Sequence, residues 1–339
     1  MAVFLAERGI DVWGIDLAWS LVPLDEQNLA FMGEWGLQRQ VDEVSIALDL
    51  ALSKRGKHKN RGIHLLGYSL GGVIGYAFVN GEASLPCGRR RVKGWIPFDT
   101  SVKADDPAVT ARACEMARAT DAMLAGGILR DATNALAAQV GFLARTDPDG
   151  ASPIFPGFTN RQVAIVVLAL PSPEPPGVDN PAYHLFAGIF DATTSLPVDL
   201  AHVTPSFAFE WLERFGGGAP LQLLSDATHV VCGDIELPFD DSLSSVTTPV
   251  LYVGADGGVG ASGVFSTTLL GSSDVTVTLV DLEPPTSDFL DFGHIDLATA
   301  SSAGFLAWDH VADWIRSHDD PVCSTGDEKG AARRRRRGR

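Results

Sequence analysis

The stretch of sequence that decides the fold is Gly62-Ile63-His64-Leu65-Leu66-Gly67-Tyr68-Ser69-Leu70-Gly71-Gly72-Val73-Ile74-Gly75. Residues 63–66 form an apolar run, which predicts a buried strand. A serine between two glycines follows at once, and small residues then continue in a pattern typical of a helix. Glycines at 67 and 71 leave room where a strand turns abruptly into a helix. The pattern therefore predicts a strand–turn–helix unit with Ser69 on the turn.

This setting makes Ser69 a candidate nucleophile. A serine on such a turn presents its hydroxyl at the sheet edge, but it needs an imidazole to take its proton and a carboxylate to orient the imidazole. The backbone N–H of Leu70 begins the following helix, so it is the expected donor to an oxyanion. Tyr68 has two interpretations, as a weak candidate for substrate binding or as a packing residue.

The rest of the chain alternates predicted strands and helices outside its middle third. Such alternation predicts an α/β fold with a mostly parallel sheet covered by helices on both faces. In addition to 63–66, strands are predicted at 11–17, 92–98, 249–253 and 274–281. Helices are predicted at 1–8, 37–52, 70–80 and 298–318. Reactive residues in such sheets gather at the carboxyl ends of the strands.

The candidate base is His294, because among eight histidines it alone follows the last predicted strand in a glycine-containing loop. The candidate acid has two alternatives. Asp256 follows the 249–253 strand and is preferred, although Asp-Gly is also ordinary turn chemistry. Asp99, at the end of the 92–98 strand, could reach the same histidine and is the second choice.

Residues 103–245 lack the alternation of strands and helices that the rest of the chain shows. Asp106-Pro107 is a strong helix start, alanine-rich helical sequence follows to about 145, and proline-rich breaks surround an apolar helix at 163–170. We interpret 103–245 as a mainly helical cap inserted into a core made of 1–102 and 246–320, with 321–339 as a solvated basic tail. Apolar segments around Phe186, Phe207 and Trp211 predict that the cap contacts a partly hydrophobic substrate group.

Composition narrows the classes of function. The chain has 42 acidic and 26 basic residues, a net charge of −16, and six of its arginines lie in the last seven residues. The rest of the chain is therefore strongly acidic and repels nucleic acid, so nucleic-acid binding is not expected. The chain has no apolar run of eighteen residues, so no membrane span is predicted. Its N-terminal residues also lack a signal-peptide pattern. The four cysteines have neither zinc-site spacing nor a scaffold pattern, although one or two disulfide bridges are possible. No metal or cofactor is expected, and the oligomeric state stays open.

Together these residues resemble the α/β-hydrolase superfamily, and especially its capped bacterial esterases and lipase-like hydrolases. The resemblance covers 2–98 and 248–318; its most specific motif is Gly-Tyr-Ser-Leu-Gly at 67–71, and Phe292-Gly293-His294-Ile295-Asp296 is similar to the superfamily's histidine loop. It implies a serine hydrolase that cleaves small carboxylic esters through an acyl-enzyme, without a cofactor. A non-catalytic ligand-binding homologue and a lactone or amide hydrolase are the alternatives.

The sequence departs from the superfamily before residue 63. Three further strands are expected there, and the loop after one of them, often with a His-Gly pair, supplies a second oxyanion N–H; the chain has no His-Gly pair. We therefore expect either that the sequence is a truncated reading of a longer gene or that residues 12–17 pair directly with 63–66. Localisation depends on this choice: cytoplasmic for the chain as given, and secreted for a longer product that carries a signal peptide.

Overall fold

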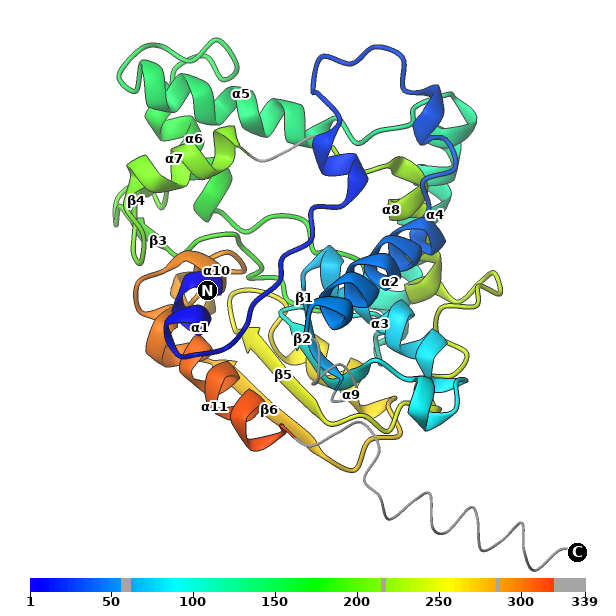
Figure 1. Ribbon diagram of the computed structural model, residues 1–339. Helices are drawn as coiled ribbons and strands as arrows, with labels where there is room; N and C mark the ends of the chain where they lie inside the picture. Colours follow the sequence, from blue (N-terminus) through cyan, green and yellow to red (C-terminus); the bar gives the residue numbers. More distant parts are fainter. Residues whose placement is uncertain (56–61, 215–217, 285–286, 320–339) are drawn as a thin grey trace, which may run out of the picture.

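The computed structural model describes residues 1–55, 62–214, 218–284 and 287–319 (Figure 1). Its main sheet has the strand order β1-β2-β5-β6, and each neighbouring pair is parallel. The four strands are Ile63–Tyr68 (β1), Val92–Phe98 (β2), Val250–Ala255 (β5) and Val275–Val280 (β6). Because the strands are parallel, their carboxyl ends meet at one edge, where the next residues are Ser69, Asp99, Asp256 and Asp281. The α/β fold class is confirmed.

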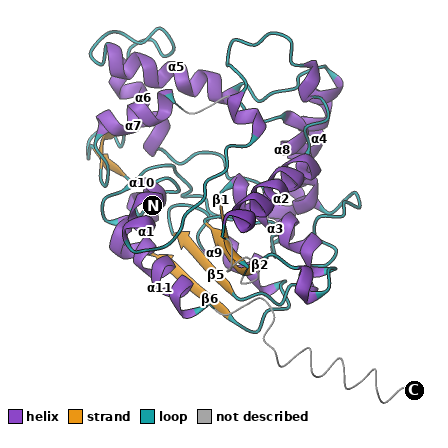
Figure 2. Ribbon diagram, in the orientation of Figure 1, coloured by secondary structure: helices purple, strands orange, loops and turns teal. Residues whose placement is uncertain are grey.

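Helices cover both faces of this sheet, as the alternation predicts (Figure 2). Side chains of β2 alternate between the two faces: Trp95 packs with the α2–α3 side, while Ile96 and Phe98 pack with the α1–α11 side. All three side chains are fully buried, so β2 is a central strand. The helices of the core are Ala2–Glu7 (α1), Leu37–Lys54 (α2), Leu70–Ala83 (α3), Ala261–Thr268 (α9), Asp296–Thr299 (α10) and Asp309–Ser317 (α11).

Two predicted elements differ from the structure. Residues 11–17 form no strand, and Val12, Trp13 and Ile15 are 38–50% exposed. Direct pairing of 12–17 with 63–66 is therefore wrong; among the described residues β1 is an edge strand. A strand-like pattern forms a strand only where a neighbouring strand takes up its hydrogen bonds and side-chain contacts. The helix predicted at 298–318 is interrupted at Ala300, whose backbone is extended. A π-helical turn at Gly304–Trp308 (η7) then runs directly into α11.

The residues predicted as a cap, 103–245, are mainly helical, and those of them that the structure describes add no strand to the main sheet. We call them the cap segment; its division from the core stays a prediction. Its helices are Pro107–Ala125 (α4), Thr133–Thr146 (α5), Asn160–Ala169 (α6), Pro205–Glu213 (α7) and Leu221–Cys232 (α8). An unpredicted antiparallel hairpin joins Gly188–Phe190 (β3) to Pro197–Leu200 (β4). Asp106 caps α4 by accepting a hydrogen bond from the N–H of Ala108, with proline at the first helical position, as expected.

The cap segment packs as two groups of helices. Helices α5, α6 and α7 form one group, and α4 packs along α8 to form the other (Figure 1). The second group is continuous with the core, because Leu223 and Val230 of α8 join the hydrophobic cluster that α2 and α3 build. Phe186 is fully buried inside the first group, so it is not available to a substrate; Phe207 is 42% exposed.

Short helical turns complete the described structure. They occupy Ala18–Leu21 (η1), Ala30–Met32 (η2), Cys87–Arg89 (η4), Leu243–Ser245 (η5) and Asp288–Leu290 (η6). No helix in the described part of the chain combines the length and the apolar composition that crossing a bilayer requires. The predicted basic tail lies outside the described residues.

Candidate active site

Ser69 lies on a sharp turn between β1 and α3. Its backbone has φ +54° and ψ −128°, a conformation that L-residues rarely adopt and that is strained. The turn is fixed from β2: Ser69 N–H donates to the carbonyl of Phe98 at 3.1 Å, and the hydroxyl of Thr100 donates to the Ser69 carbonyl at 2.8 Å. The predicted strand–turn–helix unit is present, with Ser69 at its apex.

The glycines around Ser69 have unequal roles. A Cβ on Gly67 would lie 2.5 Å from the carbonyl oxygen of Gly71, so this position requires glycine. A Cβ on Gly71 would meet nothing within 4 Å, so our expectation that its side chain would collide is wrong. Glycine is instead needed one turn into α3, where a Cβ on Gly75 would lie 2.1 Å from the Trp95 ring. The close approach of α3 to β2 holds the turn against the sheet.

Three side chains form a continuous hydrogen-bonded chain at this edge of the sheet. His294 Nε2 lies 2.9 Å from the hydroxyl oxygen of Ser69, and His294 Nδ1 lies 2.6 Å from Asp99 Oδ2. Asp99 is fully buried and His294 is 4% exposed. With the carboxylate accepting from Nδ1–H, Nε2 is left as the acceptor for the serine proton. The structure therefore brings together Ser69, His294 and Asp99, the second of the two candidate acids.

Backbone N–H groups from the last residue of β5 and from the glycine-rich loop after it hold the Asp99 carboxylate. Ala255, Val259 and Gly260 donate to it at 3.0, 3.2 and 3.2 Å. A Cβ on Gly258 would lie 2.3 Å from Asp99 Oδ2, so the loop can close around the carboxylate only with glycine there. Asp99 itself has φ +44°. These donors compensate for the removal of the carboxylate from water.

Asp256, the preferred acid, has a different position. Its carboxylate oxygens lie within 4.8 Å of those of Asp281 and Asp291, at the end of β6. Burial, followed by the charges of Asp288, Asp281 and Asp291, raises the pKa of Asp256. The glycine-rich loop contributes its backbone to the site rather than the Asp256 side chain. The expected contact of His294 with Asp256 is therefore not formed, and Asp99 takes that position.

Aromatic rings support His294 from two sides. Tyr68 stacks on the imidazole with ring centroids 4.8 Å apart, and its hydroxyl donates to the His294 carbonyl at 2.7 Å. The Tyr183 ring lies 5.6 Å from the imidazole in a tilted arrangement. Tyr68 thus packs against the histidine, and its contact with a substrate stays a prediction. Tyr183, from the cap segment, has no motif in the sequence that could have revealed it.

The cap segment also fixes the histidine loop through its backbone. The N–H of His294 donates to the carbonyl of His184 at 2.9 Å, and that of Ile295 donates to Leu185 at 2.8 Å. The His184 ring bonds the carbonyl of Asp291 through Nε2 at 2.9 Å. A Cβ on Gly293 would lie 2.6 Å from the Leu185 carbonyl oxygen, which explains the glycine before the histidine. These supporting residues are distant in sequence, so no local pattern predicts them.

Asp296 anchors the same loop. Its Oδ2 accepts from the N–H groups of Ala187 at 2.7 Å and Gly293 at 3.0 Å. Its Oδ1 is buried with no partner among the described residues. Burial raises the pKa of Asp296 to about 7, and the two backbone donors lower it by a smaller amount.

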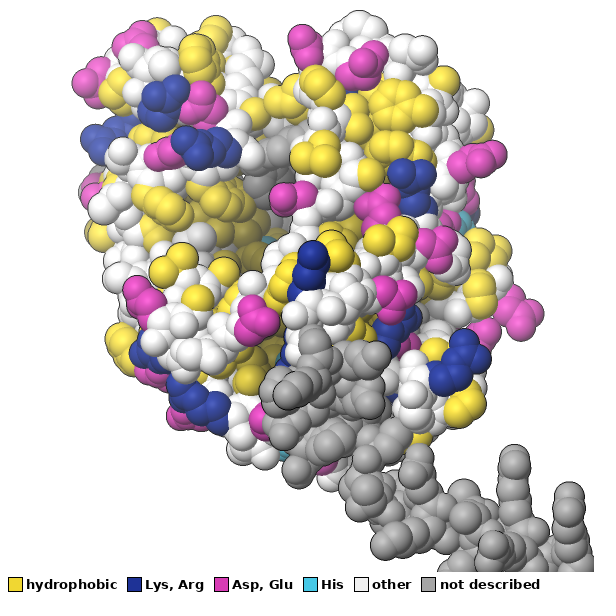
Figure 3. All heavy atoms as spheres, in the orientation of Figure 1, with side chains coloured by type: hydrophobic (Ala, Val, Ile, Leu, Met, Phe, Trp, Pro, Cys, Tyr) yellow, Lys and Arg dark blue, Asp and Glu magenta, His cyan; other side chains and the backbone are white. Residues whose placement is uncertain are grey.

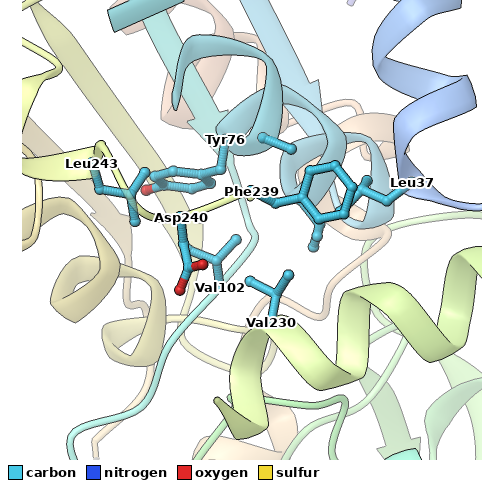
Figure 4. A pocket seen from close by; sticks show the side chains of 9 residues that line it. Leu37, Tyr76, Val102, Val230, Phe239, Asp240 and Leu243 are labelled. Carbon is cyan, nitrogen blue, oxygen red and sulfur yellow. The ribbon is translucent and has the colours of Figure 1, made fainter. Parts of the chain in front are cut away.

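Leu70 is the first residue of α3. The first N–H groups of a helix have no acceptor within the helix, so the N–H next to Ser69 is open to an oxyanion on geometric grounds. Its role stays a prediction. The apolar pocket shown in Figure 4 is a separate feature, lined by core side chains of α2, α3 and α8 such as Leu37, Tyr76 and Val230. It is too tight for water, so we assign it to core packing.

Comparisons with known proteins show what fold these elements build. No family model matches the chain, and no curated protein matches it. A structure from Sulfolobus solfataricus, provisionally assigned as a lipase, is 18% identical with a TM-score of 0.55, covering 87% of this chain and 70% of its own. An esterase from Thermogutta terrifontis is 14% identical (TM-score 0.35; 82% and 76% covered). A proline iminopeptidase from Mycobacterium smegmatis is 16% identical (TM-score 0.37; 88% and 75%). The likeness to the first of these structures, with its TM-score of 0.55, shows the α/β-hydrolase fold; at 18% identity it shows the fold alone.

Proposed function

We propose that this chain, which has the α/β-hydrolase fold, is a serine hydrolase that cleaves carboxylic esters. One observation carries the proposal: Ser69, on a strained turn, is connected through His294 to the buried carboxylate of Asp99 by contacts of 2.9 and 2.6 Å. Chance packing rarely gives this connectivity to a serine with φ +54°. Strain and a buried ionisable network are costly, and they are typical of catalytic sites.

In the proposed mechanism Ser69 Oγ attacks the ester carbonyl while its proton moves to His294 Nε2. The imidazolium that forms is stabilised by Asp99, and the Leu70 N–H stabilises the oxyanion. His294 then gives the proton to the leaving alkoxide, and an acyl group remains on Ser69. A water molecule then attacks the acyl carbon while its proton moves to the same nitrogen. The bond to Ser69 Oγ breaks, His294 returns the proton to Oγ, and the acid leaves.

The surface above the sheet edge supports an ester with an apolar group. Figure 3 shows the surface hollowed between the group of α5–α7 and the lobe that contains the N-terminal segment before α2 together with α4 and α8, with hydrophobic side chains on the walls (compare Figure 1). The cap segment leaves large apolar side chains exposed, including Leu136 (50%), Phe142 (49%) and Phe207 (42%). These side chains are already about half buried, so a substrate that covers one of them contributes roughly 1 kcal/mol, about half the value for a fully exposed side chain. We therefore expect medium-chain esters to be better substrates than acetates.

The test combines covalent labelling with a substrate panel. A fluorophosphonate probe should label the wild-type chain and a Ser84→Ala control equally, because Ser84 is an exposed residue at the end of α3. It should not label Ser69→Ala. Equal labelling of Ser69→Ala would refute the assignment of the nucleophile.

Hydrolysis of p-nitrophenyl esters of increasing chain length then tests the reaction. We expect turnover that both Ser69→Ala and His294→Gln abolish. Labelling without turnover of esters would favour lactone or amide cleavage. Saturable ligand binding with neither labelling nor turnover would favour the non-catalytic alternative.

A further inference from the structure

A cluster of cysteine, histidine and aspartate lies between α4 and α8, outside the candidate active site. Cys114 of α4 forms a disulfide with Cys232 of α8, with Cα atoms 4.8 Å apart. The Cys114 and Cys232 sulfurs and an Asp234 carboxylate oxygen lie within 4.8 Å of one another. Asp234 in turn contacts His229 Nδ1 at 2.7 Å. Cys114, Cys232 and Asp234 thus present three metal-binding atoms at one place, and His229 adjoins them through its contact with Asp234.

Helical periodicity and one glycine create this convergence. Ser225, His229 and Cys232 are spaced four and three residues apart along α8, so they lie on one face of the helix. Gly233 ends the helix with φ +70° and lets the next residue fold back toward His229. Asp121, seven residues after Cys114, lies on the matching face of α4.

The His229 ring is oriented as metal-binding imidazoles usually are. Its Nε2 contacts Asp121 Oδ2 at 2.9 Å, and the hydroxyl of Ser225 donates to the other oxygen of Asp121 at 2.6 Å. A carboxylate that accepts from one imidazole nitrogen fixes the ring and directs the other nitrogen toward the metal. Here the other nitrogen, Nδ1, faces Asp234 beside the sulfurs. The His229 side chain is only 6% exposed, whereas that of Asp234 is 37% exposed and leaves a route from solvent.

We infer that this cluster binds zinc when the Cys114–Cys232 disulfide is reduced, with Cys114, Cys232, His229 Nδ1 and Asp234 as the four ligands. Two sulfurs, one imidazole and one carboxylate are a ligand set that suits tetrahedral zinc. With Zn–S distances of about 2.3 Å, a tetrahedral site holds its two sulfurs about 3.8 Å apart, so the sulfur–sulfur bond must break first. The disulfide and the metal site are therefore mutually exclusive.

The chemistry balances with a thiol reductant. Two equivalents of a thiol supply two electrons and two protons, become a disulfide themselves and leave Cys114 and Cys232 as thiols. Zinc then displaces the two thiol protons and the Nδ1 proton, and Asp234 exchanges its contact with Nδ1 for the metal. Asp121 keeps its contact with Nε2 throughout. The sequence gives no sign of the site, because the two cysteines are 118 residues apart.

The experiment uses the full chain, reduced with a phosphine and freed of metal. One equivalent of Co²⁺ should produce the visible bands of tetrahedral cobalt with a thiolate-to-metal charge-transfer band, and Zn²⁺ should displace it at one ion per chain. The oxidised chain should show neither signal. Competition with a chromogenic chelator then gives the zinc affinity.

Substitutions locate the site. Cys114→Ser should abolish the charge-transfer signal, Asp234→Asn should weaken zinc binding by tenfold or more, and Asp121→Asn should weaken it by about 10–100-fold. Asp234 is half-exposed, so its variant keeps the test valid if Cys114→Ser does not fold. Cys87→Ser and His318→Gln, which lie outside the cluster, are controls that should bind like the wild type. Absence of stoichiometric binding in the reduced chain, or loss in Cys87→Ser but not in Cys114→Ser, would overturn the inference.

Discussion

The identity of the acid at the candidate active site gives the sharpest prediction, tested by the pair Asp99→Asn and Asp256→Asn. Asparagine at 99 keeps the Oδ1 that accepts from the N–H groups of Ala255 and Gly260, but it replaces Oδ2 by an NH₂ group. That group faces Nδ1 of His294 and the N–H of Val259, both of which donate to Oδ2 in the wild type. Two donors then oppose each other at each contact.

The imidazole escapes this conflict only in its other tautomer, with the proton on Nε2. That nitrogen can no longer take the proton of Ser69, so kcat should fall by about 10⁴-fold, the loss that this change causes in a Ser-His-Asp protease. The fall corresponds to ~5.5 kcal/mol in the activation barrier. The Val259 N–H also loses its acceptor in a fully buried place, which should reduce the free energy of unfolding by about 1–3 kcal/mol.

Asp256→Asn is the matched control, since both residues follow neighbouring strands of the same sheet. It removes a charge that three other carboxylates oppose, so kcat should change by about twofold or less, as for a substitution away from the site. The measurements are kcat and KM for a p-nitrophenyl ester and urea unfolding of all three proteins. Full activity in Asp99→Asn together with a large loss in Asp256→Asn would refute the assignment.

Three further predictions follow from the supporting structure. Gly75→Ala should reduce the free energy of unfolding by about 1–3 kcal/mol, because its Cβ would lie 2.1 Å from the Trp95 ring. A Cβ on Gly71 meets open space, so Gly71→Ala should be as stable as the wild type or more stable. Urea unfolding measures both variants, and equal losses would contradict this account of the turn. Burial raises the pKa of Asp296 to about 7, whereas an aspartate in an unfolded chain has a pKa of about 3.9. The folded state therefore binds the proton more tightly than the unfolded state. The free energy of unfolding should fall by about 1.4 kcal/mol per pH unit as the pH rises from about 4 to about 7. Asp296→Asn should flatten that part of the profile, and an unchanged slope would show that another group titrates. Tyr68→Phe removes the hydrogen bond to the His294 carbonyl but keeps the stacked ring. We expect the free energy of unfolding to fall by about 1 kcal/mol, and ester hydrolysis to show a reduced kcat with an unchanged KM. A change confined to KM would instead indicate that Tyr68 contacts the substrate.

Local patterns were sufficient for much of the fold. The apolar run before Ser69, the small residues after it and the alternation of strands and helices predict β1, α3, β2, β5 and β6 close to their observed bounds, because each signal depends on neighbours in sequence. The same local reasoning failed at residues 11–17. A strand pattern there finds no paired neighbour, and whether a neighbour exists is not written in the segment itself.

The sequence by itself determined that a serine on a strained turn and a histidine after the last strand would lie at one sheet edge, because parallel strands place their carboxyl ends together. Only the tertiary structure decided which aspartate completes the arrangement. Asp99 and Asp256 are equivalent as strand-end residues, and the choice depends on how the glycine-rich loop folds: its N–H groups close around Asp99 and turn Asp256 toward Asp281. The packing of α4 along α8 likewise placed Cys114 beside Cys232, His229 and Asp234. Contacts between residues more than a hundred positions apart leave no local pattern in the sequence.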